Sequence, residues 1–217
     1  MRVRLILPPL TVLMGLFLGC KPESPPAKRE SAKPATPEHA PAIFRVKFET
    51  SKGPFVLEVH REWAPLGADR FYELTRSGFY NGARFFRVVR NFVVQFGVNG
   101  DPSVSRLWSA MRIPDDPVRE KNRKGTITFA RSGPQTRTTQ VFLNLRDNTA
   151  LDRQGFAPFG KVISGMDVIE RFYSAYGDMP PRGNGPDPSQ IELQGNRYLE
   201  MRFPRLDYIE SANIELP

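Results

Sequence analysis

The sequence predicts a mainly β domain, an antiparallel barrel or sandwich whose open ends are covered by two helices. Glycine and proline are both frequent, at 17 and 21 of 217 residues, while 40% of the residues are apolar. Several short stretches alternate apolar with polar residues, and only two stretches show a clear helical period. This combination favours a loop-rich β or α+β domain over a helical bundle.

The first predicted elements form a hairpin. In residues 43–50, IFRVKFET, apolar Phe44, Val46 and Phe48 alternate with polar residues, which indicates a half-buried strand. A Ser-Lys-Gly turn follows, and residues 54–60, PFVLEVH, alternate again. The two strands are therefore expected to pair.

Two stretches have the features of helices. Residues 63–78 place Pro65 in the first turn and Gly78 at the stop, with an apolar stripe between them. Residues 165–177, GMDVIERFYSAYG, gather apolar and aromatic side chains on one side and end at a glycine. Residues 177–190 are expected to form a loop, because glycine and proline recur there.

The remaining apolar runs predict further strands. They lie at residues 126–130, 141–145 and 159–163, and a last strand within residues 206–216 is expected to return to the first.

Residues 85–97, FFRVVRNFVVQFG, form a second predicted hairpin that carries Arg87 and Gln95 among apolar residues. A two-residue loop would place these two side chains on opposite faces, whereas a three-residue loop at residues 90–92 pairs Arg87 directly with Gln95. From spacing alone, the pair is either a solvated hairpin face or a polar site beside an apolar pocket.

The N-terminal part divides into a leader at residues 1–20 and a disordered, proline-rich tether at residues 21–42, before a folded domain at residues 43–217. The leader, MRVRLILPPLTVLMGLFLGC, is too short and too interrupted for a comfortable membrane span. Its ending resembles a bacterial lipoprotein lipobox, with Phe17 where that family prefers leucine, and we expect lipidation of Cys20. Ordinary signal-peptide cleavage is the alternative.

Composition excludes several kinds of site. Cys20 is the only cysteine, so a disulfide within the chain is impossible and a cysteine-based metal site is not expected. A Ser-His-Asp site lacks support because only His60 lies in the predicted domain, at a strand end. No glycine-rich phosphate loop is present, and Asp115 and Asp116 are expected in a surface turn between prolines.

The chain resembles the cyclophilins along residues 43–215. The resemblance rests on FYNGARFFRVVRNFVVQFG, GTITFARSGPQTRTTQVFLNL and LDRQGFAPFGKVISGMDVI in this order, and QGNRYLEMRFPRLDYIESANI is similar to a bacterial branch. It implies an eight-stranded antiparallel barrel capped by two α-helices, with peptidyl-prolyl cis–trans isomerase activity.

The resemblance also implies the site residues. Arg87 matches the catalytic arginine, and Gln95 matches its partner glutamine. The residues expected to bind substrate are Phe92, Val93, Ala130, Arg131, Ser132, Gln140, Phe142, Leu151 and Phe156.

Some of these positions depart from the family. Val93 replaces a methionine, and Ala150 replaces a frequent tryptophan, so we expect weak cyclosporin binding. Arg131 replaces an asparagine, and its cation is expected to favour acidic peptides. Phe156 stands where the family often has histidine.

We therefore predict an isomerase that acts on proline-containing polypeptides outside the cytoplasm, without cofactor or metal. The lipid on Cys20 would anchor it in the cell envelope, and because Lys21 is not an aspartate, the expected location is the periplasmic side of the outer membrane. We expect a monomer that binds no nucleic acid, although the net charge is +8. The alternatives are a peptide-binding module without turnover and a basic domain that binds nucleic acid or anionic lipid.

Overall fold

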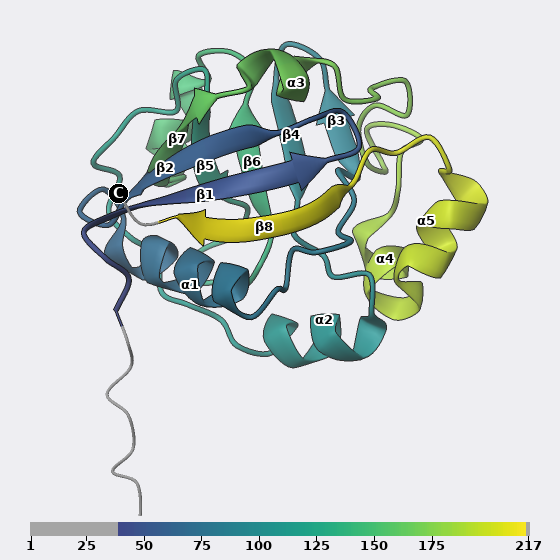
Figure 1. The fold of residues 1–217 in the computed structure, drawn as a ribbon, viewed down its shortest axis with the longest axis horizontal. Coiled ribbons are helices and arrows are strands. Elements are labelled where there is room, and N and C mark those ends of the chain that lie inside the picture. Colours follow the sequence, from purple (N-terminus) through teal and green to yellow (C-terminus); the bar gives the residue numbers. More distant parts are fainter. Residues whose placement is uncertain (1–38, 216–217) are drawn as a thin grey trace, which may run out of the picture. The chain divides into compact units, whose positions relative to one another are not determined.

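The computed structural model describes residues 39–215, and its architecture is an eight-stranded antiparallel sheet (Figure 1). The leader, Cys20 and residues 21–38 of the predicted tether lie outside the described residues. Along the sheet the strands follow the order β3-β4-β6-β5-β7-β2-β1-β8. Their bounds are β1 Ile43–Thr50, β2 Phe55–His60, β3 Arg87–Val89, β4 Val93–Phe96, β5 Thr126–Phe129, β6 Val141–Asn144, β7 Pro158–Ser164 and β8 Ile209–Glu215.

The two ends of this sheet meet just before β3 and β8. The backbone N–H of Gly82 donates to Ile209 O at 2.8 Å, and the N–H of Ile209 donates to Ala83 O at 2.9 Å. The N–H of Phe85 donates to Asp207 O at 3.0 Å. The sheet is therefore curled into a barrel, as predicted, and β8 pairs with β1 as expected.

Two helices, α1 (Pro65–Arg76) and α3 (Met166–Glu170), lie at opposite ends of the barrel (Figure 1). Phe71 of α1 and Ile169 of α3 are fully buried in the main core, so each helix caps one end. The main core is rich in aromatic side chains that interlock edge to face and face to face.

Helix α3 is shorter than predicted. The expected helix ran to residue 177, whereas α3 ends at Glu170. The N–H of Tyr173 donates to the Asp207 carboxylate at 2.7 Å instead of continuing the helix, and the Phe172 ring stacks on Phe85 at 4.0 Å. Contacts with distant residues therefore end the helix before its glycine.

Three further helices were missed by the sequence analysis: α2 (Pro102–Ser109), α4 (Pro188–Gln194) and α5 (Asn196–Arg202). The predicted loop at residues 177–190 is thus wrong for its last three residues, which belong to α4. Both α2 and α4 start with Asp-Pro-Ser, and in each the aspartate accepts a hydrogen bond from the serine N–H. Aspartate as N-cap followed by proline is a helix-start signal that could have been recognised.

Helices α4 and α5 contribute to a second, smaller core at one side of the barrel. It consists of Phe86, Val98, Ile191, Leu199 and Leu206, all at most 4% exposed. This core attaches the segment after α3 to the barrel wall.

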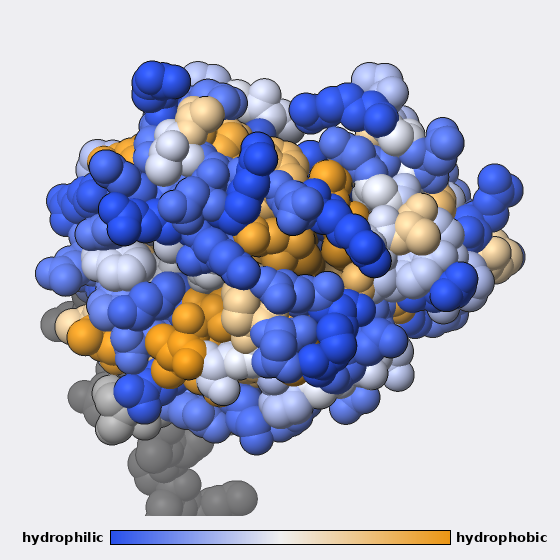
Figure 2. Space-filling view, turned by 90° about the horizontal axis from the view of Figure 1, so that it is seen from above, coloured by the Kyte–Doolittle hydropathy of each residue, from blue (hydrophilic) through white to orange (hydrophobic). Residues whose placement is uncertain are grey.

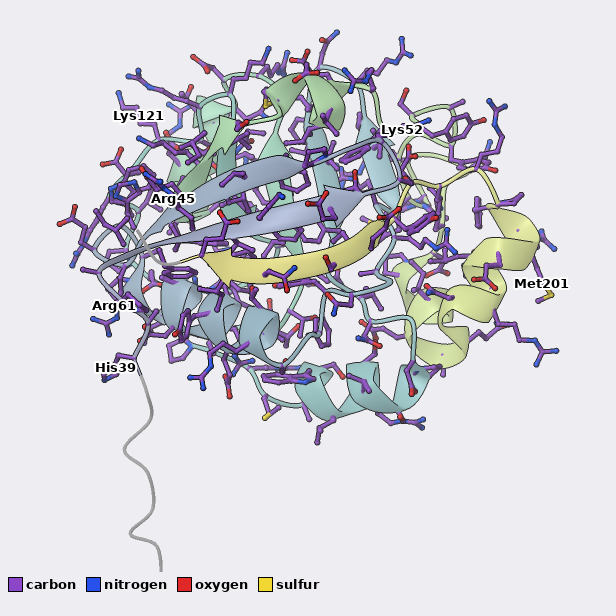
Figure 3. The ribbon with its side chains drawn as sticks, viewed as in Figure 1. His39, Arg45, Lys52, Arg61, Lys121 and Met201 are labelled. Carbon is purple, nitrogen blue, oxygen red and sulfur yellow. The ribbon has the colours of Figure 1, made fainter. Side chains whose placement is uncertain are left out.

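Residues 39–42, predicted as the end of the tether, contact the barrel domain. The N–H of Ala40 donates to Asp69 at 2.9 Å, and the Ala40 side chain is buried. His39 and Arg61 (labelled in Figure 3) both contact the carboxylate of Asp69 in α1, at 2.9 Å and 2.7 Å. Residues 39–42 are therefore held against the barrel domain.

Asp115 and Asp116 do not form the expected surface turn. Asp116 is 6% exposed and accepts hydrogen bonds from the N–H groups of Leu66 and Gly67, at 3.0 and 2.8 Å. These are the free N–H groups of the first turn of α1, and Arg137 pairs with the same carboxylate. Asp116 thus caps the first turn of α1, whereas Asp115 pairs with Arg131.

The surface near α3 is mostly hydrophilic. In Figure 2 hydrophilic side chains cover most of the visible face, and hydrophobic ones show in recesses between them. Among the described residues, no helix has the length and apolar character needed to cross a membrane.

Candidate active site

The hairpin β3–β4 places Arg87 beside Gln95. The register pairs Arg87 with Gln95 and Val89 with Val93, which leaves a three-residue loop. Asn91 in this loop has a φ of 55°, a conformation that asparagine tolerates better than most residues. The three-residue alternative is therefore confirmed.

A chain of hydrogen bonds joins three of the polar side chains. Nη1 of Arg87 donates to Oε1 of Gln95 at 3.0 Å, and Nε2 of Gln95 donates to Oε1 of Gln140 at 2.9 Å. Arg87 and Gln95 are only 7% and 5% exposed. A buried cation needs such partners, because an unpaired polar group in this environment is costly.

The other side of the Arg87 guanidinium binds Asp178, a residue that the sequence analysis left in a loop. Nε donates to Oδ1 at 2.7 Å and Nη2 to Oδ2 at 3.3 Å. Burial would raise the pKa of Asp178, but hydrogen bonds from Arg87 and from the Met179 N–H bring this pKa below its ordinary value. The carboxylate is therefore ionised at neutral pH.

Arg87, Gln95 and Gln140 line one wall of a cavity of about 690 Å³. Every residue of the described chain that the sequence analysis assigned to the site lines this cavity. The eleven are Arg87, Phe92, Val93, Gln95, Ala130, Arg131, Ser132, Gln140, Phe142, Leu151 and Phe156.

The apolar part of the cavity lies next to the arginine. The Phe92 ring centroid is 5.5 Å from Cζ of Arg87, and the rings of Phe142 and Phe156 meet edge to face at 5.7 Å. Val93 and Leu151 complete this recess. Its apolar lining suits a small apolar ring.

Buried asparagine side chains hold the backbone of two aromatic residues of the recess, Phe92 and Phe156. Nδ2 of Asn148 donates to Phe92 O, and Nδ2 of Asn122 donates to Phe156 O, both at 2.9 Å. Asn144 connects them by hydrogen bonds to both asparagines. The sequence analysis missed this network, because a buried asparagine has no periodic signature.

Arg131 does not present a free cation to the cavity. Its guanidinium donates to Asp115 and to Gln154 O, and it lies over the Phe156 ring at 5.4 Å. This pairing argues against the expectation that the cation favours acidic peptides, which stays a prediction. The residue instead braces the edge of the apolar recess.

The cavity continues beyond the predicted residues, toward α2 and α4. Its additional lining is Ser109, Arg112, Thr136, Thr138, Gln154, Met179, Arg182, Pro188, Ser189 and Glu192. Several of these lie on helices that the sequence analysis did not recognise. Among the described residues, no group of three or more His, Cys, Asp or Glu side chains could hold a metal ion.

An antiparallel barrel of eight strands, with an apolar recess beside a buried arginine and glutamine, defines the cyclophilin class. The family model for cyclophilin type peptidyl-prolyl cis-trans isomerase/CLD matches residues 45–187, more than half of the chain. The chain belongs to this family and is a cyclophilin-type peptidyl-prolyl cis–trans isomerase.

Curated relatives support the same assignment. A peptidyl-prolyl cis-trans isomerase of Acinetobacter baylyi is 35% identical over 139 residues, which cover 61% of this chain and 73% of that protein. Peptidyl-prolyl cis-trans isomerase CYP18-2 of Arabidopsis thaliana is 33% identical over 154 residues, 68% of this chain and 90% of that protein.

A solved structure shows the same fold. The crystal structure of a Cryptosporidium parvum cyclophilin type peptidyl-prolyl cis-trans isomerase matches with a TM-score of 0.59 at 20% identity, covering 81% of this chain and 99% of that one. The same protein crystallised in the presence of the dipeptide Ala-Pro gives a TM-score of 0.57.

Proposed function

We propose that this isomerase accelerates X–Pro rotation in polypeptides outside the cytoplasm, with Arg87 as the group that stabilises the twisted bond. The observation that supports the role of Arg87 is its position, buried and held at the wall of the apolar recess.

Rotation about an X–Pro bond requires no covalent step. Amide resonance sets the barrier of about 18–20 kcal/mol, so a catalyst must weaken resonance in the twisted state. When the bond twists, the proline nitrogen becomes pyramidal, and its lone pair is no longer delocalised into the carbonyl and can accept a hydrogen bond. A guanidinium N–H that donates to this nitrogen binds the twisted state more tightly than the planar one, which lowers the barrier.

The other residues hold the peptide around this donor. The recess of Phe92, Val93, Phe142, Leu151 and Phe156 receives the proline ring in a place poor in water. Gln95 and the backbone of residues 130–132 would bind the peptide on either side, and Gln140 braces Gln95. Fixing both sides while the bond rotates turns binding energy into catalysis.

The activity test uses an Ala-Pro peptide, a choice supported by the Ala-Pro dipeptide present with the Cryptosporidium parvum relative. We expect clear acceleration by the purified chain, and a fall in kcat/KM of about 10²–10³ in Arg87→Ala. Peptide binding without acceleration by the unmutated chain would instead support a binding module. Full activity in Arg87→Ala would remove Arg87 from the mechanism.

The location is tested separately. We propose that Cys20 carries a lipid that holds the isomerase at the periplasmic face of the outer membrane. Cells that express the full chain are fed a labelled fatty acid and fractionated. We expect label in the outer-membrane fraction for the unmutated chain, and an unlabelled, released protein for Cys20→Ala. A released, unlabelled unmutated chain would favour ordinary signal-peptide cleavage.

A further inference from the structure

We propose that Asp178 is a positioning residue for the reaction, which fixes the guanidinium of Arg87 in the orientation that meets the substrate. This inference rests on the role proposed above for Arg87.

Counting the N–H donors of the Arg87 guanidinium shows which of them are left for a substrate. A guanidinium has five N–H donors. Asp178 accepts one from Nε and one from Nη2, and Gln95 accepts one from Nη1. One N–H on Nη1 and one on Nη2 are left after these three hydrogen bonds. Asp178 thus holds the guanidinium by its Nε–Nη2 side and leaves these two donors for a substrate.

The loop after α3 is folded around Asp178. The N–H of Met179 donates to its carboxylate at 2.8 Å, and the N–H of Gly185 donates to its carbonyl at 2.9 Å. A Cβ at Gly183 would lie 2.3 Å from the Asp178 carbonyl oxygen, so only glycine fits there. The loop therefore fixes both the backbone and the side chain of this residue.

The loop is in turn attached to the second core. The Tyr176 ring meets Phe203 edge to face at 5.0 Å, and Ile191 of α4 and Leu199 of α5 are buried in that core. Helices α4 and α5 follow residue 187, where the family match ends. We infer that one task of this C-terminal helical pair is to hold the loop that carries Asp178.

Two effects of the carboxylate oppose each other. Its negative charge weakens the field of Arg87 at the reacting bond, whereas its two hydrogen bonds restrict a flexible side chain to one orientation. Positioning is the larger effect, because a displacement of about 1 Å of a catalytic group can lower a rate about 10²-fold. Gln95 alone holds a single N–H and cannot define the plane of the guanidinium.

The test measures kcat and KM of the unmutated chain, Asp178→Ala and Asp178→Asn on an Ala-Pro peptide by exchange NMR. We expect kcat to fall about 10-fold in Asp178→Ala, with KM changed less than about 2-fold. In Asp178→Asn the amide oxygen still accepts one hydrogen bond, so we expect a loss of about 3-fold. Unchanged or increased kcat in both variants would overturn the proposal.

The matched control is Asp167→Asn. Asp167 also pairs with an arginine, Arg171 at 2.6 Å, but this pair is exposed on α3 and does not line the cavity. We expect its kcat and KM to equal those of the unmutated chain. An equal loss in the control would assign the effect to surface charge rather than to Arg87.

A double variant separates this inference from the proposed function. If Arg87→Ala is fully active, the proposed role of Arg87 fails. If Arg87→Ala loses activity while Asp178→Ala does not, only the inference fails. We expect Asp178→Ala to have no further effect in the Arg87→Ala background. The same 10-fold loss in that background would show that Asp178 acts on the fold rather than through Arg87.

Discussion

Two buried arginines of this isomerase, Arg87 and Arg137, each pair with a carboxylate, yet their surroundings differ. Arg137 is 3% exposed, and its guanidinium contacts Asp115, Asp116 and Pro114 O. Asp116 in turn binds the first turn of α1, and Arg137 does not line the cavity. Arg87 is also buried, at 7% exposed, but it lines the cavity beside the apolar recess.

The comparison teaches that burial and an ion pair do not by themselves indicate a functional arginine. What distinguishes Arg87 is its position in the cavity wall beside an apolar recess, because Arg137 also has an unused donor: its Nε makes no hydrogen bond. Arg137 contacts two carboxylates and one carbonyl and lies away from the cavity, which is the pattern of a structural link. The following predictions test this distinction, from the largest expected effect to the smallest.

Arg137→Ala should be the most damaging change for stability. It leaves the buried Asp116 without its cation, and we expect the free energy of unfolding to fall by about 3–5 kcal/mol. Urea unfolding measures this loss, and Arg171→Ala, which removes an exposed arginine, should leave the midpoint unchanged. A loss of kcat/KM of about 10² per folded molecule in Arg137→Ala would contradict its purely structural assignment.

Arg87→Ala should show the opposite pattern. The loss of kcat/KM of about 10²–10³ expected above comes with a smaller loss of stability, about 1–2 kcal/mol. Asp178 remains partly exposed at 20% of its side chain, so water replaces part of the lost pair. Urea unfolding curves and kcat/KM, both measured on Arg87→Ala, test this prediction. A loss of stability as large as that of Arg137→Ala would erase the contrast between the two arginines.

The pH dependence of kcat/KM should reflect the ionisation of Asp178. Its folded pKa lies below the ordinary value of 3.8, so the pair with Arg87 is complete above that value and is lost as the pH falls through the lower folded pKa. We therefore expect kcat/KM to be constant from about pH 8 to about pH 5. A rate profile corrected for unfolding measures this, and a titration near neutral pH that Asp178→Asn abolishes would contradict it.

Arg131→Ala should have the smallest effect on substrate choice. Because its guanidinium is already bound by Asp115, we expect the ratio of kcat/KM for Glu-Pro and Lys-Pro peptides to change less than about 2-fold. Arg112 lines the same cavity without an ion pair among residues 39–215, so Arg112→Ala should lower the preference for Glu-Pro further. A larger shift in Arg131→Ala than in Arg112→Ala would restore Arg131 as the acidic-peptide contact.

The sequence by itself determined the features that depend on neighbouring residues. Alternation with a period of two predicted strands such as β1, and Pro65 with Gly78 delimited α1 within two residues. The hairpin pattern reduced the register of Arg87 to two alternatives, and the resemblance to the cyclophilins supplied the site residues. All of these signals lie within short segments or recognisable motifs.

Only the tertiary structure decided which distant groups meet. Asp178 is 91 residues from Arg87, and Asp116 is 21 residues from Arg137. Asp207 ends α3 from 34 residues away. An ion pair or a cap of this kind has no period and no fixed spacing, because the chain between the partners can have almost any length. The sequence therefore shows the charged residues Asp178 and Arg87, but only the folded barrel shows that they are partners.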